Sequence, residues 1–356
     1  MTDNKGYFLI DKLEADRSLS RNEWLYLFHN ISDDLSEYLF LKAEKKRQDV
    51  FGDAVYIRGL IEFTNHCHND CYYCGIRKSN VRLDRYRLSK KEIMECCREG
   101  YRLGFRTFVL QGGEDRYYHT DDICEIISGI KAAYPDCAVT LSIGECSKKD
   151  YEAFFKAGAD RYLLRHETIS SDHYAMLHPK NMSYDNRISC LYNLKDIGYQ
   201  VGCGFMVGSP GQTPEMLADE MLFLKAFNPH MVGIGPFIPH HQTPFASKPP
   251  GTLKLTLYCL GLIRLMLSEA LLPATTALGT ISPDGRELGI KAGANVVMPN
   301  LSPISARKKY ELYDNKLYTG EESAQSLDFL KLKMKNIGMR LVVDRGDSPM
   351  INNRRK

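Results

Sequence analysis

The sequence lacks the long apolar stretches and the strong charge bias that mark several protein classes. Its first twelve residues, MTDNKGYFLIDK, contain no apolar core of a secretory signal. The most apolar run, residues 255–272, is interrupted by Arg264 and Glu269, which predicts a buried core helix and not a membrane span. The net charge of +3 is too small to indicate nucleic-acid binding, and the basic end at 353–356 is expected to be a solvated tail.

The sequence also lacks a dinucleotide-binding fingerprint and a disulfide framework. No G-x-G-x-x-G follows the first predicted strand, which argues against a doubly wound dinucleotide-binding sheet. Eleven cysteines are scattered through a long chain without a signal, so we expect a reducing, cytoplasmic environment. Five lie at apolar helical positions and are expected in the core: Cys96, Cys97, Cys124, Cys190 and Cys259. The sequence leaves open whether Cys203 faces the interior of a barrel.

The most informative stretch that is present is FTNHCHNDCYYCG, residues 63–75, in which Cys67, Cys71 and Cys74 form a C-x3-C-x2-C array. A structural zinc site needs four protein ligands, and no fourth cysteine lies nearby. Three thiolates on a four-iron cluster instead leave one iron open to a chelating ligand. Tyr73 precedes the last cysteine, so an aromatic ring is held beside that iron. The alternative is a set of three buried or zinc-binding thiols.

The predicted elements indicate an α/β protein. Residues 1–50 form an N-terminal helical extension, in which Ser20 and Glu23 make a capping box. From residue 55, strands alternate with helices that end at glycines, which favours parallel βα units. Eight strands are predicted, at 55–63, 107–111, 138–142, 161–165, 199–206, 231–235, 273–276 and 295–298. This number fits a (β/α)8 TIM-type barrel; a partial barrel and an open sheet are the alternatives. The expected divisions are 1–50, a barrel with a C-terminal segment over 51–345, and a flexible basic tail over 346–356.

The active site of such a barrel lies where the strands end. Gln111, Gly112, Gly113 and Glu114 follow the second strand, and the paired glycines allow close backbone approach to a ligand. Arg161 and Arg165 share one face of the fourth strand, with Glu167 just beyond. Buried arginines are costly unless they meet anions, although an Arg–Glu pair at the rim is the alternative. His240 and His241 are adjacent, so their side chains are expected to point apart rather than share a metal.

The cysteine array with its preceding aromatic residue resembles the signature of the radical S-adenosylmethionine (SAM) superfamily. Four longer motifs resemble the HydE family, radical SAM maturases of FeFe-hydrogenases, a relative of the biotin synthase branch. They are RYLLRHET (161–168), MVGIGPFIPH (231–240), PATTALGT (273–280) and GANVVMPN (293–300). The resemblance covers about residues 10–345. Some members carry a second cysteine cluster after the eighth strand, but here no cysteine follows Cys259, so one 4Fe-4S cluster is expected.

The resemblance implies roles for individual residues. Cys67, Cys71 and Cys74 match the ligands of the catalytic cluster, and the glycine-rich loop with Glu114 matches the loop that holds the SAM ammonium. Glu167 and Arg187 match residues that hold the ribose and methionyl parts of SAM. Nine residues match the lining of the internal cavity: Gln111, Thr140, Arg161, Arg165, Met231, Thr275, Thr276, Tyr310 and Tyr313.

The resemblance also implies an activity and partners. The enzyme would reductively cleave SAM and act at sulfur on an organometallic iron precursor with carbon monoxide, cyanide and cysteine ligands. HydG would make this precursor, HydF would accept the product, and a reducing electron donor would be needed. The nearer alternative is a radical SAM enzyme of the methylornithine or biotin synthase type. The more distant alternative is a non-catalytic iron–sulfur carrier. A carrier would not bind SAM, so the glycine-rich loop, Glu167 and Arg187 would then have no function.

Overall fold

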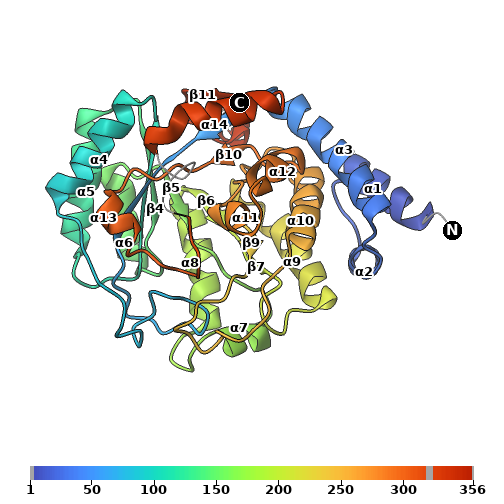
Figure 1. Cartoon of the computed structure of the whole chain (residues 1–356), viewed down its shortest axis with the longest axis horizontal. Helices are drawn as coiled ribbons and strands as arrows, with labels where there is room; N and C mark the ends of the chain where they lie inside the picture. The colour runs from blue at the N-terminus through green and yellow to red at the C-terminus, as the bar shows by residue number, and fades with distance from the viewer. Residues whose placement is uncertain (1–3, 318–323, 355–356) are drawn as a thin grey trace.

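The computed structural model describes residues 4–317 and 324–354, and it shows a (β/α)8 barrel preceded by three helices (Figure 1). The first three helices are α1 (Asn4–Asp16), α2 (Arg21–His29) and α3 (Asp33–Phe51). The strands are β1 (Ala54–Ile57), β2 (Gly59–Thr64), β3 (Thr107–Gly112), β4 (Ala138–Ser142), β5 (Arg161–Leu163), β6 (Gln200–Cys203), β7 (Met206–Val207), β8 (Met231–Val232), β9 (Gly235–Pro236), β10 (Val296–Val297) and β11 (Arg340–Val342). The later helices are α4 (Lys90–Arg102), α5 (Thr120–Ala133), α6 (Lys148–Ala157), α7 (Ser171–Leu177), α8 (Tyr184–Ile197), α9 (Pro214–Phe227), α10 (Leu253–Met266), α11 (Thr276–Ile281), α12 (Gly285–Lys291), α13 (Ile304–Arg307) and α14 (Leu327–Asn336). Short 3₁₀ turns span Ala324–Ser326 and Pro349–Arg354.

The strands close into a ring through parallel pairing. Six of them form one sheet in the order β2-β3-β4-β5-β6-β8, and β1 pairs with β10 on one side and β11 on the other. The first barrel strand is divided at Arg58 into β1 and β2. β1 pairs with β10, the last strand of the ring, whereas β2 pairs with β3. The predicted seventh strand is much shorter than expected. It makes only the isolated bridges Met231↔Leu271 and Pro273↔Val296, because Thr275 already caps α11.

Local sequence signals explain where most helices begin. Ser89 with Glu92 and Ser147 with Asp150 form capping boxes at the starts of α4 and α6. Thr213 caps α9, whose first residue is Pro214. The predicted bounds of β4, 138–142, are those observed. These helices therefore begin where the sequence predicts. The carboxyl ends of the parallel strands lie together on one side of the barrel.

Helix α10 is apolar on nearly all sides because other elements cover two opposite sides of it. It packs between the barrel and the N-terminal helices α1 and α3, as Figure 1 shows at its right edge. The predicted buried core helix is thus confirmed. None of the described helices has the length and apolar character needed to cross a bilayer.

The predicted flexible tail over 346–356 is wrong for the part that the structure describes in full. Ser348 is 1% exposed, and Asp347 accepts hydrogen bonds from Arg161 (2.5 Å) and Gln200 (2.8 Å). Both partners are the first residues of their strands, so this segment covers the end of the barrel where the strands begin. A fully buried arginine needs a counter-charge, which Asp347 supplies. Residues 355–356 lie outside the described part.

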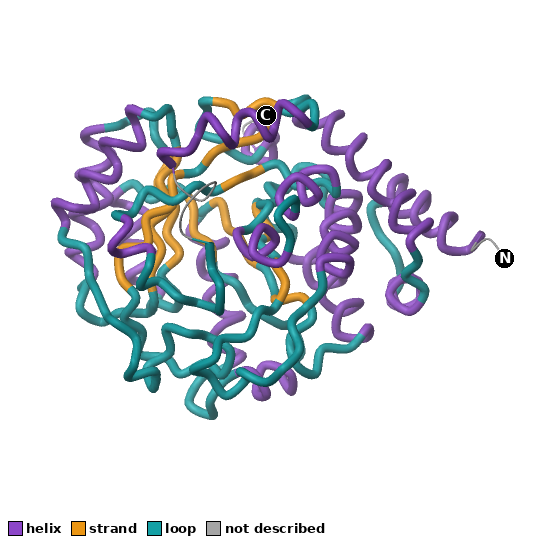
Figure 2. The backbone as a smooth tube through the Cα atoms, in the orientation of Figure 1, coloured by secondary structure: helices purple, strands orange, loops and turns teal. Residues whose placement is uncertain are grey.

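The opposite end of the barrel carries the long loops. Figure 2 shows them as the mass of teal segments at the bottom of the view, below the strands. This is the side on which the strands end and on which the cysteine loop lies. The fold therefore brings residues from several strands to one mouth.

Candidate iron–sulfur and cofactor site

An internal cavity of about 330 Å³ opens where the strands end. Cysteine thiols, charged groups, aromatic rings, hydroxyl and amide groups, and aliphatic side chains line it. The predicted site residues among them are Cys67, Cys71, Tyr73, Cys74, Gln111, Gly112, Gly113, Glu114, Arg165, Glu167, Arg187, Thr275, Thr276, Tyr310 and Tyr313. The fold thus brings together most of the residues selected from the sequence.

The three cysteines are half-buried free thiols in a tightly packed loop. Glycine is required at position 113, because a Cβ there would lie 2.2 Å from the His66 carbonyl oxygen and 2.7 Å from Cys67 Cβ. Gly75 is equally confined, and its N–H donates to the Leu312 carbonyl at 2.8 Å. The glycine-rich loop and the segment after the eighth strand therefore hold the cysteine loop from two sides.

The surroundings of the three thiols disfavour the thiolate form unless a cation is bound. Burial raises the pKa of Cys67 and of Cys71, and it raises the pKa of Cys74 to about 12. The neighbouring thiols raise the pKa of Cys71 and Cys74 further, because adjacent thiolates repel. Iron would reverse this balance by binding the thiolate forms. Among the described residues, the cavity contains no fourth cysteine and no histidine, so the donor set fits a cluster with one open iron.

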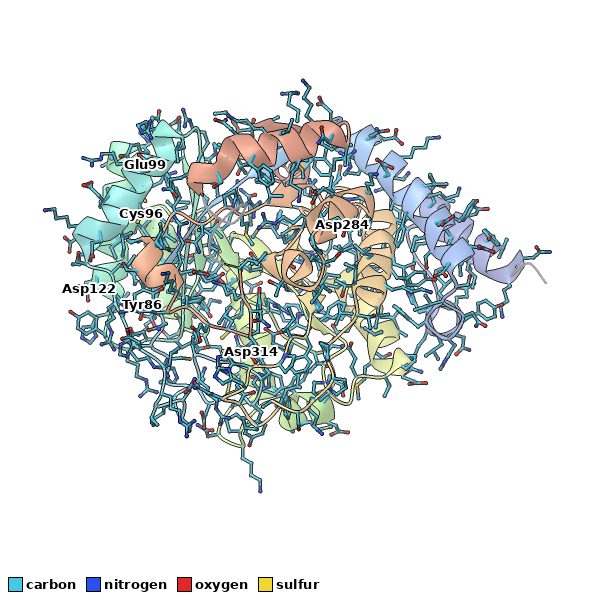
Figure 3. The ribbon with its side chains drawn as sticks, viewed as in Figure 1. Tyr86, Cys96, Glu99, Asp122, Asp284 and Asp314 are labelled. Carbon is cyan, nitrogen blue, oxygen red and sulfur yellow. The ribbon has the colours of Figure 1, made fainter. Side chains whose placement is uncertain are left out.

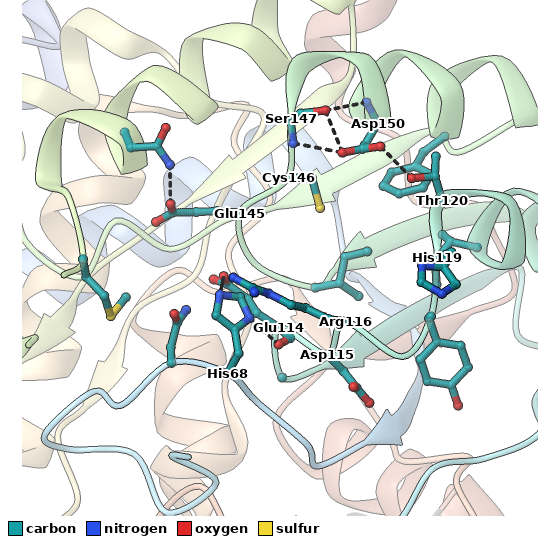
Figure 4. Close-up of a pocket in the computed structure, with 18 of the residues that line it drawn as sticks. His68, Glu114, Asp115, Arg116, His119, Thr120, Glu145, Cys146, Ser147 and Asp150 are labelled. Carbon is teal, nitrogen blue, oxygen red and sulfur yellow. Dashed lines mark hydrogen bonds and ion pairs between the residues drawn. The ribbon is translucent and has the colours of Figure 1, made fainter. Parts of the chain in front are cut away.

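A buried charge network lies beside the cysteines. Arg187 pairs with Glu145 at 2.7 Å and with Glu114 at 3.5 Å. Burial alone would lower the pKa of Arg187, but the two carboxylates raise it. Burial raises the pKa of Glu114, against the opposing charge of Arg187. Figure 4 shows His68, Glu114 and Glu145 together on the wall of an adjoining surface groove of about 870 Å³.

Glu167 adopts an unusual backbone conformation at the mouth of the cavity. Its φ of +67° is rare for a residue other than glycine, and such strain is common at functional sites. The conformation is held by hydrogen bonds from its N–H to Gly204 and from Met206 N–H to its carbonyl. Its carboxylate lies 3.0 Å from Arg165, so the alternative of an Arg–Glu pair at the rim is realised for this arginine.

The deeper wall of the cavity offers polar groups with spare hydrogen-bonding capacity. Gln111 lies 3.5 Å from the Tyr310 hydroxyl. Thr275 Oγ1 is buried and has no hydrogen-bond partner within the described residues. Buried hydroxyls without partners are uncommon, so this atom is suited to a bound ligand.

Three predicted cavity residues do not line this cavity. Arg161 is the first residue of β5 and lies at the opposite end of the barrel, where it contacts Thr107 and Asp347. It precedes Arg165 by four residues, about 13 Å along a strand. Thr140 lies in register with Arg161, and Met231 begins β8 with its sulfur 2.7 Å from the Arg58 guanidinium. These residues fill the base of the barrel.

The cavity also contains charged residues that were not predicted from the sequence. Lys316 lies 2.7 Å from Glu62, whose other oxygen accepts from Asn300 at 2.8 Å. Glu62 is fully buried and Lys316 has a side chain 7% exposed. The available signal was a glutamate in a predicted strand, 55–63, whose other residues are apolar apart from Tyr56, Arg58 and Gly59.

His240 and His241 do not point apart as expected. Their rings stack with centroids 4.6 Å apart and planes 19° apart, and His241 Nδ1 lies 2.6 Å from Asp314, labelled in Figure 3. One ligand atom from each of His240, His241 and Asp314 lies within 4.8 Å of the other two, so the reason for rejecting a shared metal, side chains that point apart, is wrong. Cys203 is fully buried and packs in the core, away from the cavity.

Comparisons with known proteins agree with this geometry. Residues 61–224 match the radical SAM superfamily. The chain is 44% identical over 334 residues to the FeFe-hydrogenase maturase subunit HydE of Thermotoga maritima, covering 94% of each chain. It is 28% identical over 332 residues to 3-methylornithine synthase of Methanosarcina barkeri, covering 93% of this chain and 92% of the relative. The crystal structure of methylornithine synthase (PylB) is similar with a TM-score of 0.81 and 27% identity, covering 94% of this chain and 97% of that one. The chain therefore belongs to the HydE family of FeFe-hydrogenase maturases and is a radical SAM enzyme.

Proposed function

We propose that this protein cleaves SAM reductively at one 4Fe-4S cluster held by Cys67, Cys71 and Cys74. Its substrate is a sulfur-containing organometallic iron precursor with carbon monoxide, cyanide and cysteine ligands, used to assemble the di-iron subcluster of FeFe-hydrogenase. One observation carries the proposal: three unbridged thiols open onto the same internal cavity as Arg165 and Arg187. When bound, the cluster and SAM supply one-electron cleavage of the sulfonium and a carbon radical.

The residues near the cysteines would bind and orient SAM. The backbone of Gly112 and Gly113 approaches the cysteine loop closely enough to hold the ammonium group. Arg187 stays charged between two carboxylates and would hold the methionyl carboxylate, while Glu167 would accept a hydrogen bond from the ribose. Tyr73 supplies an aromatic surface for adenine. Fixed charges in a buried site need little reorganisation during reaction.

The deeper residues would hold the substrate. Arg165 lines the cavity and would bind an anionic ligand of the iron complex. Thr275, Thr276 and Tyr310 would donate hydrogen bonds to the remaining polar groups. The surrounding apolar wall would exclude water from a reactive radical.

The proposed partners follow from membership of the HydE family. HydG would supply the precursor, HydF would accept the product, and a reducing protein would supply the electron. A reaction of the methylornithine or biotin synthase type is the second candidate. The similarity to 3-methylornithine synthase over nearly the whole chain is the observation that supports this second candidate.

Anaerobically reconstituted protein tests the proposal. Protein reduced with dithionite is expected to form 5′-deoxyadenosine from SAM, and Cys71→Ala is expected to abolish it. A synthetic iron complex with carbon monoxide, cyanide and cysteine ligands is then compared with a panel of free amino acids and thiols. Stimulation by the iron complex supports the maturase reaction, whereas stimulation by an amino acid alone favours the second candidate. A four-iron cluster that neither binds nor cleaves SAM would leave only the carrier function.

A further inference from the structure

The segment that follows the cysteine array concentrates positive charge. Between Cys67 and Leu88 the chain carries five arginines and lysines against two aspartates. This short stretch therefore has the same formal net charge, +3, as the whole chain of 356 residues. The charge lies on the mouth of the barrel, beside the proposed cluster.

Internal partners account for part of this charge. Arg77 pairs with Asp70 at 2.6 Å, and Arg87 pairs with Asp115 at 2.7 Å. The side chains of Lys78 and Arg82 are exposed and make no ion pair with the part of the chain that the structure describes. These two cations are therefore available to a partner.

Between them lies Val81, which is 89% exposed, more than any other large hydrophobic side chain in residues 4–317 and 324–351. We define the basic rim as Lys78, Val81 and Arg82. An apolar centre flanked by charges is typical of small, transient protein interfaces. Two unpaired cations are too few to follow a nucleic-acid backbone, which needs several phosphate contacts.

The segment that carries the basic rim is held by several hydrogen bonds. The Arg85 guanidinium donates to the carbonyls of Asn65, Ile76, Arg77 (2.7 Å) and Asn80 (3.1 Å), so it ties the segment to the end of β2. A surface held in this way loses little conformational entropy when a partner binds.

Hydrogen bonds also join Lys78 and two neighbours of the basic rim, Arg77 and Asn80, to the loop that carries the cysteines. Lys78 N–H donates to the Asn69 carbonyl at 2.8 Å, and Arg77 N–H donates to the Cys74 carbonyl at 3.2 Å. The Asn80 amide donates to the Gly75 carbonyl at 2.7 Å. A protein seated on the rim is therefore separated from the thiols by only a few bonds and hydrogen bonds.

We propose that the basic rim is the docking surface for a small, acidic, one-electron carrier protein that reduces the cluster. This inference rests on the proposed function for the existence of the cluster. Each encounter moves one electron from the reduced carrier, which is oxidised, to the cluster, which goes from the 2+ to the 1+ state. No proton and no further reactant are required.

The test compares two charge-reversal variants of the reconstituted protein. Lys78→Glu/Arg82→Glu alters the basic rim. Lys45→Glu/Lys225→Glu is the matched control, because both lysines are exposed and lie on α3 and α9. The probe is a purified acidic ferredoxin with low-potential 4Fe-4S clusters. Its binding in the oxidised form is measured by calorimetry, and cluster reduction by its reduced form is followed by stopped-flow absorbance.

The rim variant is expected to weaken ferredoxin binding and slow cluster reduction about tenfold at low ionic strength, with the control unchanged. The difference is expected to shrink at about 1 M salt, where the Debye length is about 3 Å. Reduction by dithionite needs no docking surface and is expected to remain comparable in all three proteins.

Equal ferredoxin binding and reduction in the rim variant and the control would overturn the docking proposal. An equal loss with ferredoxin and with dithionite would overturn it too, because the substitutions would then have damaged the cluster. Failure of the proposed function is seen separately. In that case SAM is not cleaved under dithionite, while the ferredoxin binding and cluster-reduction measurements still decide for or against the basic rim. Val81→Ser, which keeps both charges, is expected to weaken binding without changing its salt dependence.

Discussion

The Tyr73 hydroxyl lies 3.2 Å from Nε2 of His178, and the two rings meet edge to face with centroids 5.5 Å apart. His178 is 2% exposed, and its Nδ1 lies 3.0 Å from the Tyr174 carbonyl oxygen. A carbonyl can only accept, so Nδ1 carries the proton and Nε2 accepts from the Tyr73 hydroxyl. His178 thus fixes the orientation of the aromatic ring beside the proposed cluster.

Replacement of His178 by phenylalanine is expected to weaken SAM binding about tenfold, since the loss of one buried hydrogen bond costs about 1–3 kcal/mol. Tyr73→Phe removes the same bond from the other side and is expected to have a similar effect. His178→Gln can still accept from the hydroxyl and is expected to restore part of the affinity. The affinity is measured by titrating SAM against the electron paramagnetic resonance signal of the reduced cluster. Wild-type affinity in both phenylalanine variants would contradict the role of this contact.

The buried His178 is also expected to make the free energy of unfolding depend on pH. Burial lowers the pKa of His178 from 6.5 to about 3. Between these values the unfolded chain binds a proton that the folded chain does not, so the free energy of unfolding falls as pH falls from about 6.5. Urea unfolding at several pH values between about 6.5 and 4.5 measures the slope. His178→Phe is expected to have a shallower slope than wild type, and identical slopes would contradict this assignment.

Local signals in the sequence indicated the alternation of strands and helices, although a partial barrel and an open sheet remained alternatives to the closed barrel. An apolar run predicted β4, and serine caps followed by acidic residues mark the starts of α4 and α6. The spacing of Cys67, Cys71 and Cys74 was sufficient for the candidate site, because a short loop must bring ligands of such spacing together. These features depend on contacts within a few residues of one another.

Features that depend on distant contacts were not predictable in this way. The alternation of a strand gives the face of Arg161 but not its depth, so the arginine was assigned to the wrong end of the barrel. Its counter-charge, Asp347, lies 186 residues away. The contact between Glu62 and Lys316 spans 254 residues, and the contact between Tyr73 and His178 spans 105. No local sequence pattern indicates which of the many charged or polar residues will contact one another in the folded protein.

Gly113→Ala is expected to lower the amount of iron bound after reconstitution. The added Cβ would lie 2.2 Å from the His66 carbonyl oxygen, so the cysteine loop must shift. Gly129→Ala in α5 is the matched control, because its nearest neighbour would be at 3.6 Å and alanine favours a helix. Iron and sulfide analysis measures the effect. Full cluster loading of Gly113→Ala would show that the close approach is not needed to form the site.

Lys316→Met is expected to destabilise the protein by about 3–5 kcal/mol, because it leaves the fully buried Glu62 carboxylate without its cation. Asn300 would still donate to Glu62, but one amide cannot replace a full charge. The double variant Glu62→Gln/Lys316→Met removes both charges and is expected to recover much of the lost stability. Chemical unfolding of the wild type, both single variants and the double variant gives the coupling free energy. Additive effects of the two substitutions would mean that the ion pair contributes nothing beyond its separate side chains, and that the charge of Lys316 is free to meet a ligand in the cavity.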